Sequence, residues 1–283
     1  MKYTVVSPVK NEAKFIQHTL DSVTSQTVKP HEWVIVDDGS TDNTLEILRE
    51  YAAKYDWIKI LENNTHSEAR AGGSKVVRAF NKGYKLITDH SYDVIVKLDG
   101  DLELPSNYFE TVIQTFSENP TVGICGGYIM NKTDTGLVKE IDIDYHVRGA
   151  FKSVRKTCFD EIGGFKEMWN WDGLDQMAAM MKGWETRVFE LPVIHYRPTS
   201  SAYNPYKFYF KSGRFAYRLR TNFFLHLLRT GARIKRKPYL ISAITYFLGY
   251  FYAVINSEEF MIDKDLGDFT NEYHTNRILK RLF

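Results

Sequence analysis

The chain opens with short apolar runs that alternate with segments of helical spacing. The runs are rich in β-branched residues and predict strands at residues 3–9, 32–40, 58–63 and 92–101. Between them, apolar residues recur at helical intervals and predict helices at residues 13–26, 41–55 and 74–87. This β-α-β-α order predicts an α/β fold, with a mostly parallel sheet and helices on both of its faces.

The pattern changes after about residue 200. Residues 207–237 include ten basic residues and no acidic one, with aromatic residues between them. A charge-free stretch of about 19 residues, Pro238–Asn256, follows and is near the lower limit for a membrane span. We therefore expect a catalytic domain at 1–200 and a basic, aromatic, helical extension at 201–283.

Basic residues interleaved with aromatic ones are typical of a segment that lies on an anionic membrane. The stretch 238–256 carries four tyrosines along its length, which favours a helix lying in the membrane interface over a spanning helix. The alternative is a helix pair packed on the catalytic domain, with a basic face that binds an anionic substrate. No other feature supports nucleic acid as a partner.

Composition narrows the class of protein. A chain with 43% apolar and 25% charged residues is folded rather than disordered. Its two cysteines, Cys125 and Cys158, are too few for a disulfide framework and fit a reducing compartment. The first residues hold no apolar stretch long enough for a signal peptide, so we expect a cytoplasmic protein, peripheral on the inner face of the cell membrane.

Acidic residues follow two of the predicted strands, where ligands bind in such sheets. Asp99 and Asp101 flank Gly100, and carboxylates at positions i and i+2 of a strand point to the same side. Such a pair suits Mg²⁺ or Mn²⁺ with bound phosphates, and the glycine lets a diphosphate approach the backbone. The alternative is a solvated Asp-Gly turn.

Asp37 and Asp38 end the second predicted strand. An acid in this position can accept hydrogen bonds from ribose hydroxyls or a base N–H. The alternative is a loop that caps the next helix, and Ser40, Thr41 and Asp42 are the candidate caps. The two interpretations are compatible.

Five segments in this order resemble the large second family of inverting glycosyltransferases, which has the GT-A type fold. They are TVVSPVKNEAKFIQHTLDSVTSQT, EWVIVDDGSTDNTLEIL, RAFNKGY, VIVKLDGDLELP and EIGGF. The resemblance covers roughly residues 3 to 200, and the DDGSTD stretch followed by a DxD is its most specific part.

The resemblance implies a role for each matching position on the donor side. Pro8 and Glu12 would line the nucleotide pocket, and Asp38 would contact the base or ribose. Asp99 would contact the ribose or sugar, and Asp101 would hold Mg²⁺ or Mn²⁺. Asn81 and Gly83 would form part of the nucleotide-sugar site. Arg70 and Arg78 are candidate phosphate contacts. His195 would be a metal ligand or contact the diphosphate.

The family also has a Glu-Asp pair in which the aspartate is the catalytic base. Here Trp171 replaces the glutamate, and counting back from Gly183 places Asp172 at the base position. Asp175, three residues on, is the competing candidate. A helix N-cap is the alternative role for either. Neighbouring tryptophans, among them Trp171, are expected to bury the base and raise its pKa.

The resemblance implies that a sugar is transferred from a nucleotide diphosphate donor in one displacement, which inverts the anomeric carbon. The acceptor would be a hydroxyl of a glycan or lipid-linked molecule in surface polysaccharide or glycoconjugate synthesis. One alternative is a polyprenyl-phosphate glycosyltransferase, whose acceptor is already ionised and needs no base. The other is a non-catalytic module that binds nucleotide sugars. A phosphate acceptor should tolerate the loss of Asp172, whereas a hydroxyl acceptor should not. Donor hydrolysis would separate both enzymes from the non-catalytic module.

Overall fold

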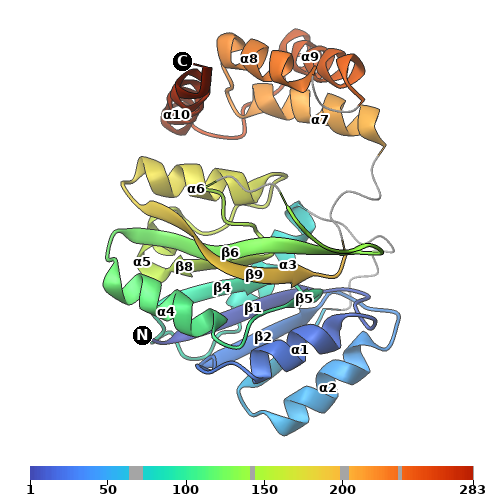
Figure 1. Ribbon diagram of the computed structural model, residues 1–283, viewed down its shortest axis with the longest axis vertical. Helices are drawn as coiled ribbons and strands as arrows, with labels where there is room; N and C mark the ends of the chain where they lie inside the picture. The colour runs from blue at the N-terminus through green and yellow to red at the C-terminus, as the bar shows by residue number, and fades with distance from the viewer. Residues whose placement is uncertain (64–72, 141–143, 198–203, 235–237, 283) are drawn as a thin grey trace. The chain divides into compact units, whose positions relative to one another are not determined.

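The chain folds into two compact units, Met1–Pro198 and Thr199–Phe283, and each is described by itself (Figure 1). The structure is a computed structural model. It describes residues 1–63, 73–140, 144–197, 204–234 and 238–282.

The first unit is built on a nine-stranded sheet with strand order β3-β2-β1-β4-β8-β6-β9-β5, and β7 pairs with β6. The strands are β1 Tyr3–Val9, β2 Glu32–Asp37, β3 Ile58–Glu62, β4 Val94–Leu98, β5 Leu102–Glu103, β6 Val122–Thr133, β7 Gly136–Lys139, β8 Phe151–Arg155 and β9 Glu185–His195.

Strands β1 to β4 are parallel to one another, as the alternating pattern predicts. Strand β8 then runs antiparallel to both β4 and β6, so the complete sheet is mixed. Because the carboxyl ends of β1, β2 and β4 meet at one edge, the loops after these strands come together there. These are the loops that carry most of the candidate donor-site residues.

Helices cover both faces of the sheet, because alternate residues of each central strand face opposite sides (Figure 1). Val5 and Ile35 pack on the side of α1, α2 and α4, whereas Val6 and Val34 pack on the side of α3, α5 and α6. The predicted fold class is thus confirmed. The helices are α1 Ile16–Thr24, α2 Thr44–Lys54, α3 Ser74–Tyr84, α4 Tyr108–Glu118, α5 Lys156–Glu161 and α6 Trp171–Met181.

Helix α3 approaches the sheet closely at Gly83. A Cβ atom there would lie 2.6 Å from Val36 Cγ2 and 2.8 Å from Val6 Cγ1. Those distances are far below a normal carbon contact, so the glycine is required for the packing of α3 on β1 and β2.

The second unit consists of α7 Pro205–Arg218, α8 Phe223–Arg233, α9 Leu240–Ile255 and α10 Lys264–Leu282. Two glycines let α7 and α9 approach each other. A Cβ at Gly213 would lie 2.0 Å from the Tyr246 carbonyl oxygen, and one at Gly249 would lie 2.1 Å from that of Phe210. Across the described residues, no helix is both long and apolar enough to cross a membrane.

Candidate active site

Asp99, Gly100 and Asp101 form the turn that joins β4 to β5, so the two acids are not on a strand as the sequence predicts. The i, i+2 argument for their direction therefore does not apply. A Cβ at Gly100 would lie 2.8 Å from Val9 Cγ1 and 2.9 Å from Ile16 Cδ1, so the packing of the core requires a glycine here. Its role in the approach of a diphosphate stays a prediction.

Asp101 and His195 lie together although they are distant in sequence. Leu102 of β5 pairs with His195 of β9, and the Asp101 carbonyl oxygen accepts a hydrogen bond from Tyr196 N–H at 3.0 Å. Asp101 Oδ1 is 3.5 Å from His195 Nε2, and both side chains are buried. Burial disfavours the charged imidazole, but the Asp101 carboxylate outweighs it, so the pKa of His195 is raised.

These two side chains fit a hard divalent cation. A carboxylate oxygen and an imidazole nitrogen are both ligands of Mn²⁺, and Mg²⁺ or Mn²⁺ takes its remaining ligands from water and substrate phosphates. His195 Nδ1 is buried and has no hydrogen-bond partner among the described residues. No hydrogen bond at Nδ1 therefore determines which ring nitrogen of His195 carries the proton. Within the described ranges, no group of three or more potential metal ligands is found.

Asp99 is held by a neighbouring lysine. Lys97 Nζ forms a short ion pair with Asp99 Oδ1, and Lys97 itself is almost fully buried in β4. Burial raises the pKa of Asp99 and the charge of Asp101 adds to the rise, while Lys97 opposes it. The paired lysine thus keeps one acid of the turn in place beside the other.

The loops after β1 and β2 are joined by hydrogen bonds. Asn11 N–H donates to Ser40 Oγ at 2.9 Å, and Asn11 Oδ1 accepts from Thr41 N–H at 2.7 Å. The N-cap of α2 is Asn43 rather than Ser40, Thr41 or Asp42, although Asp42 Oδ1 accepts from the Thr44 N–H. These polar residues therefore mainly connect two loops, which corrects their predicted role as helix caps.

The predicted nucleotide-pocket residues lie around these loops. Pro8 is half-buried opposite Val36 in the β1–β2 register. Glu12 is buried, and its carboxylate lies 2.7 Å from the Arg197 guanidinium just after β9. Asp38 accepts a short hydrogen bond from Asn63. The structure places all three residues at the carboxyl ends of the parallel strands.

The α3 candidates make contacts of a different kind. Asn81 Nδ2 donates to Glu167 at 3.4 Å, and Arg78 Nε lies 3.2 Å from the same carboxylate. These contacts connect α3 to the segment before α6. A role for Asn81 in donor binding stays a prediction, and Arg70 lies outside the described residues.

Asp172 lies in the first turn of α6 with its side chain 26% exposed. Its Oδ2 lies 3.4 Å from Gly149 N and 3.7 Å from His146 Nε2, whereas no described residue hydrogen-bonds to Oδ1. Burial would raise the pKa of Asp172, but Lys152 and His146 outweigh it and hold the pKa below its ordinary value. The expectation that burial raises the pKa of the base is therefore wrong for Asp172.

Asp175 has a different environment. Both of its carboxylate oxygens accept from Lys152 Nζ, at 2.7 and 2.8 Å, and both side chains are buried. Burial raises the pKa of Asp175 to about 7, although Lys152 opposes the rise. Lys152 Nζ also donates to the Asp172 carbonyl at 2.7 Å, so the Lys152–Asp175 pair anchors the start of α6.

This pair gives a prediction about stability. Asp175→Ala leaves the buried Lys152 charge without its partner, which should lower the free energy of unfolding by about 3–5 kcal/mol. Asp160→Ala, which removes an exposed pair with Lys156, is the matched control and should cost less than about 1 kcal/mol. Chemical unfolding curves measure both. Equal effects of the two substitutions would contradict the anchoring role.

The Asp99–Asp101 turn and the start of α6 are neighbours. Lys97 and Lys152 are paired residues of β4 and β8, and their ammonium groups lie over the Trp171 ring at 5.6 and 5.2 Å from its centroid. Asp99 N–H donates to the Ala150 carbonyl, next to Gly149, whose N–H points to Asp172. Asp99 and Asp172 therefore flank the same backbone segment.

The sequence interpretation missed four ionisable residues of this site: Lys97, His146, Lys152 and Arg197. A signal was present for Lys97, because it interrupts the apolar run of a predicted strand. Lys152 lies in a strand of mixed composition that the sequence analysis did not predict. His146 and Arg197 lie in irregular segments without such a signal.

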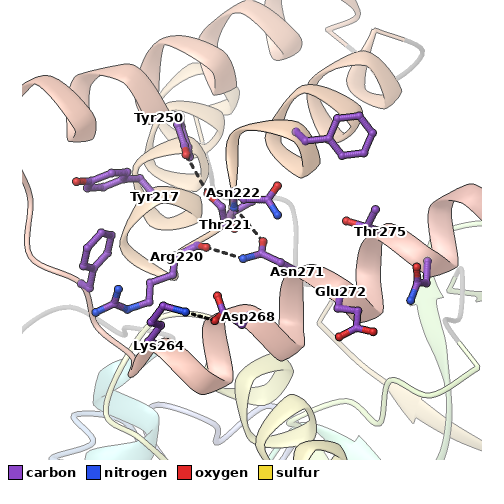
Figure 2. A pocket seen from close by; sticks show the side chains of 13 residues that line it. Tyr217, Arg220, Thr221, Asn222, Tyr250, Lys264, Asp268, Asn271, Glu272 and Thr275 are labelled. Carbon is purple, nitrogen blue, oxygen red and sulfur yellow. Dashed lines mark hydrogen bonds and ion pairs between the residues drawn. The ribbon is translucent and has the colours of Figure 1, made fainter.

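A pocket of about 550 Å³ lies within the helical unit, as Figure 2 shows. Its polar groups bond to one another. Asn271 donates to the Arg220 carbonyl and accepts from Asn222 N–H, at 2.7 and 2.9 Å, and Lys264 pairs with Asp268. The two Asn271 bonds attach α10 to the α7–α8 connection, whereas the Lys264–Asp268 pair lies within α10. We therefore assign the pocket to the fold of this unit.

The mixed sheet with helices on both faces, and acidic residues after its parallel strands, is the arrangement of the GT-A type glycosyltransferase fold. Residues 4–182 match the family Glycosyl transferase family 2, which is more than half of the chain. The chain belongs to this family and is a glycosyltransferase.

Two relatives illustrate the range of the family. The poly-beta-1,6-N-acetyl-D-glucosamine synthase of Staphylococcus epidermidis is 26% identical over 208 residues, which are 66% of this chain and 46% of that protein. Glycosyltransferase AglE of Haloferax volcanii is 36% identical over 128 residues, 44% of this chain and 38% of that protein. The chain thus spans less than half the length of these relatives.

Solved structures support the fold. The complex of S. aureus TarS 1-349 with UDP-GlcNAc has a TM-score of 0.57 at 18% identity, and the match covers 92% of this chain and 74% of that chain. The mannosyltransferase PcManGT of Pyrobaculum calidifontis, in complex with GDP-Man and Mn²⁺, has a TM-score of 0.58 at 16% identity over 99% of this chain and 86% of that chain. At these identities the likeness concerns the fold alone.

Proposed function

We propose that this glycosyltransferase moves a sugar, with inversion, from a nucleotide diphosphate donor to a hydroxyl of a glycan or lipid-linked acceptor. The observation that carries the proposal is the partly exposed carboxylate of Asp172 beside the Asp99–Asp101 turn. Its lowered pKa keeps Asp172 ionised at neutral pH, and Oδ1 is left to accept a proton. A base is needed for a hydroxyl acceptor but not for an ionised phosphate.

On the donor side, Pro8, Glu12 and Asp38 would bind the nucleotide, and Asp99 would orient the ribose or sugar. Asp101 and His195 would hold Mg²⁺ or Mn²⁺, which offsets negative charge on the leaving diphosphate. Fixing the donor at the strand ends and the acceptor hydroxyl near Asp172 turns a bimolecular encounter into an oriented one. PcManGT with GDP-Man and Mn²⁺ is a fold relative with this combination of ligands.

The test is a screen of nucleotide sugars for hydrolysis and transfer, with and without Mn²⁺ and chelator. Each active donor is then offered hydroxyl acceptors and a polyprenyl phosphate. Transfer to a hydroxyl supports the proposal, whereas transfer to the polyprenyl phosphate alone supports the alternative acceptor class. Surface polysaccharide acceptors have priority, because relatives include a poly-beta-1,6-N-acetyl-D-glucosamine synthase and a poly(ribitol-phosphate) beta-glucosyltransferase.

We also propose that the enzyme works on the inner, anionic face of the cell membrane, bound through its helical unit. Two of the ten basic residues already have an acidic partner, since Glu258 forms ion pairs with Arg214 and Arg218. Arg233 stacks on the Tyr246 ring at 3.8 Å and so contributes to packing. The ten basic residues of 207–237 also include Lys235, Arg236 and Lys237, which lie outside the described residues.

Replacing Lys235, Arg236 and Lys237 by Glu should weaken co-sedimentation with anionic vesicles. Each Lys or Arg near an anionic leaflet contributes about 1 kcal/mol, an attraction that added salt weakens. Arg233 is left unchanged so that its packing is preserved. Hydrolysis of a soluble donor should stay at the level of the unmodified enzyme. Undiminished vesicle binding at low salt would rule out this segment as a membrane contact.

A further inference from the structure

Helix α9 is apolar on both of its sides. One side is buried and packs through Ala243, Tyr246, Gly249, Tyr250 and Ala253. The opposite side is exposed and consists of Leu240, Ile241, Ile244, Leu248, Tyr252, Val254 and Ile255. A surface helix normally presents polar residues to water, whereas a helix that is apolar all round is buried in protein or lipid. The exposed side therefore requires a partner.

The start of α8 extends this surface. Phe223, Phe224 and Leu227 are exposed, and the Phe223 ring lies 5.9 Å from that of Phe251 in α9. Phe251 in turn lies 4.6 Å from Phe247. These ring contacts join the two helices, and Leu227 lies one turn after Phe223 in α8, so we name the exposed side of α9, together with Phe223 and Leu227, the apolar face. Contiguous exposed apolar surface of this kind marks an interaction site.

The charge of the segment that carries the apolar face distinguishes between partners. Between Lys207 and Asn256 the chain has no Asp or Glu, so any acidic partner of the basic residues in this segment lies outside it. A second copy docking on the same face by two-fold symmetry would bring cations against cations. An anionic lipid surface has both the complementary charge and an apolar interior.

The length of α9 decides how it meets lipid. Its 16 residues span about 24 Å, less than the roughly 30 Å of a bilayer core. Its other side is already packed within the unit. We propose that α9 lies in the plane of an anionic bilayer and inserts the apolar face at the headgroup boundary. This inference rests on the proposed membrane association and adds a contribution that salt does not remove.

The test compares two double variants for binding to phosphatidylcholine vesicles with and without phosphatidylglycerol. Ile244→Glu with Leu248→Glu places charge in the apolar face, and should lower the partition coefficient by about tenfold or more, since each side chain loses apolar burial. It should also abolish the binding that persists at high salt. Leu86→Glu with Val138→Glu changes equally exposed apolar residues of the first unit and should bind like wild type.

A probe of insertion complements this comparison. A fluorophore that reports polarity can be attached at Leu248→Cys, because Cys125 and Cys158 are buried. Vesicles should shift its emission to the blue, and should leave the same probe at Leu86→Cys unchanged. Equal binding by both double variants, or no shift at residue 248, overturns the proposal. The proposal is also overturned if the wild-type protein does not bind vesicles and instead forms a dimer that the apolar-face substitutions disrupt. Donor hydrolysis by the same proteins tests the enzyme function separately.

Discussion

Replacing Asp101 by alanine should abolish metal-dependent turnover while the protein stays folded. Asp101 and His195 are the two side chains proposed to hold the cation, and the buried carboxylate of Asp101 lies 3.5 Å from His195 Nε2. Without it, a neutral imidazole is left to compete for the ion, and charge on the leaving diphosphate is no longer offset. We expect a loss of turnover on the order of 10³ or more, the scale set by removing a main electrostatic contact of the transition state.

Two measurements check this expectation. Donor hydrolysis is followed against Mn²⁺ and Mg²⁺ concentration, and Mn²⁺ binding in the presence of nucleotide diphosphate is measured by electron paramagnetic resonance. Asp160→Ala, which removes an exposed aspartate of α5, should keep wild-type turnover and metal affinity. Wild-type turnover in excess chelator would overturn the metal site, whatever the variant does.

The parallel half of the sheet could be predicted from local pattern. Strands β1 to β4 are short apolar runs whose periodicity differs from that of the helices between them, and this order fixes a parallel arrangement. The loops at the carboxyl ends of those strands followed directly, so Asp38 and Asp101 were placed at the correct edge. The family resemblance then added what periodicity cannot supply, the role of each residue.

The contacts that complete the site depend on pairings distant in sequence. His195 reaches Asp101 because β9 pairs with β5, and Lys152 lies beside Lys97 because β8 runs antiparallel to β4. Spacing along the chain carries no information about such register. For the same reason the pKa of Asp172 was expected to rise, since the tryptophans were visible in the sequence but the approach of Lys152 was not.

The charges of the helical extension also depend on contacts that the sequence does not show. Residues 207–237 hold ten basic residues and no acidic one, yet Glu258 forms ion pairs with Arg214 and Arg218. Which side of α9 faces water also depends on how α7 packs against it, through Gly213 and Gly249. The apolar face therefore appears only once the helices are assembled.

The competition between Asp172 and Asp175 for the role of base is decided by a matched pair of substitutions. Asp172→Asn keeps the shape of the side chain and removes its basicity. It should lower turnover with a hydroxyl acceptor by a factor on the order of 10² or more, with the affinity for donor unchanged. Because the pKa of Asp172 is held low, its carboxylate is ionised throughout the neutral range, so the loss should be the same from pH 6 to pH 8.

Asp175→Asn is the control, since both oxygens of Asp175 are bound by Lys152 and the side chain is buried. It should lower the melting temperature yet retain most of the turnover, when turnover is measured well below that temperature. The reverse result, with Asp175→Asn inactive and Asp172→Asn active, would move the base one turn along α6. Full activity of Asp172→Asn toward a polyprenyl phosphate, and none of wild type toward any hydroxyl, would instead show that the acceptor arrives already ionised and that Asp172 has no proton to remove.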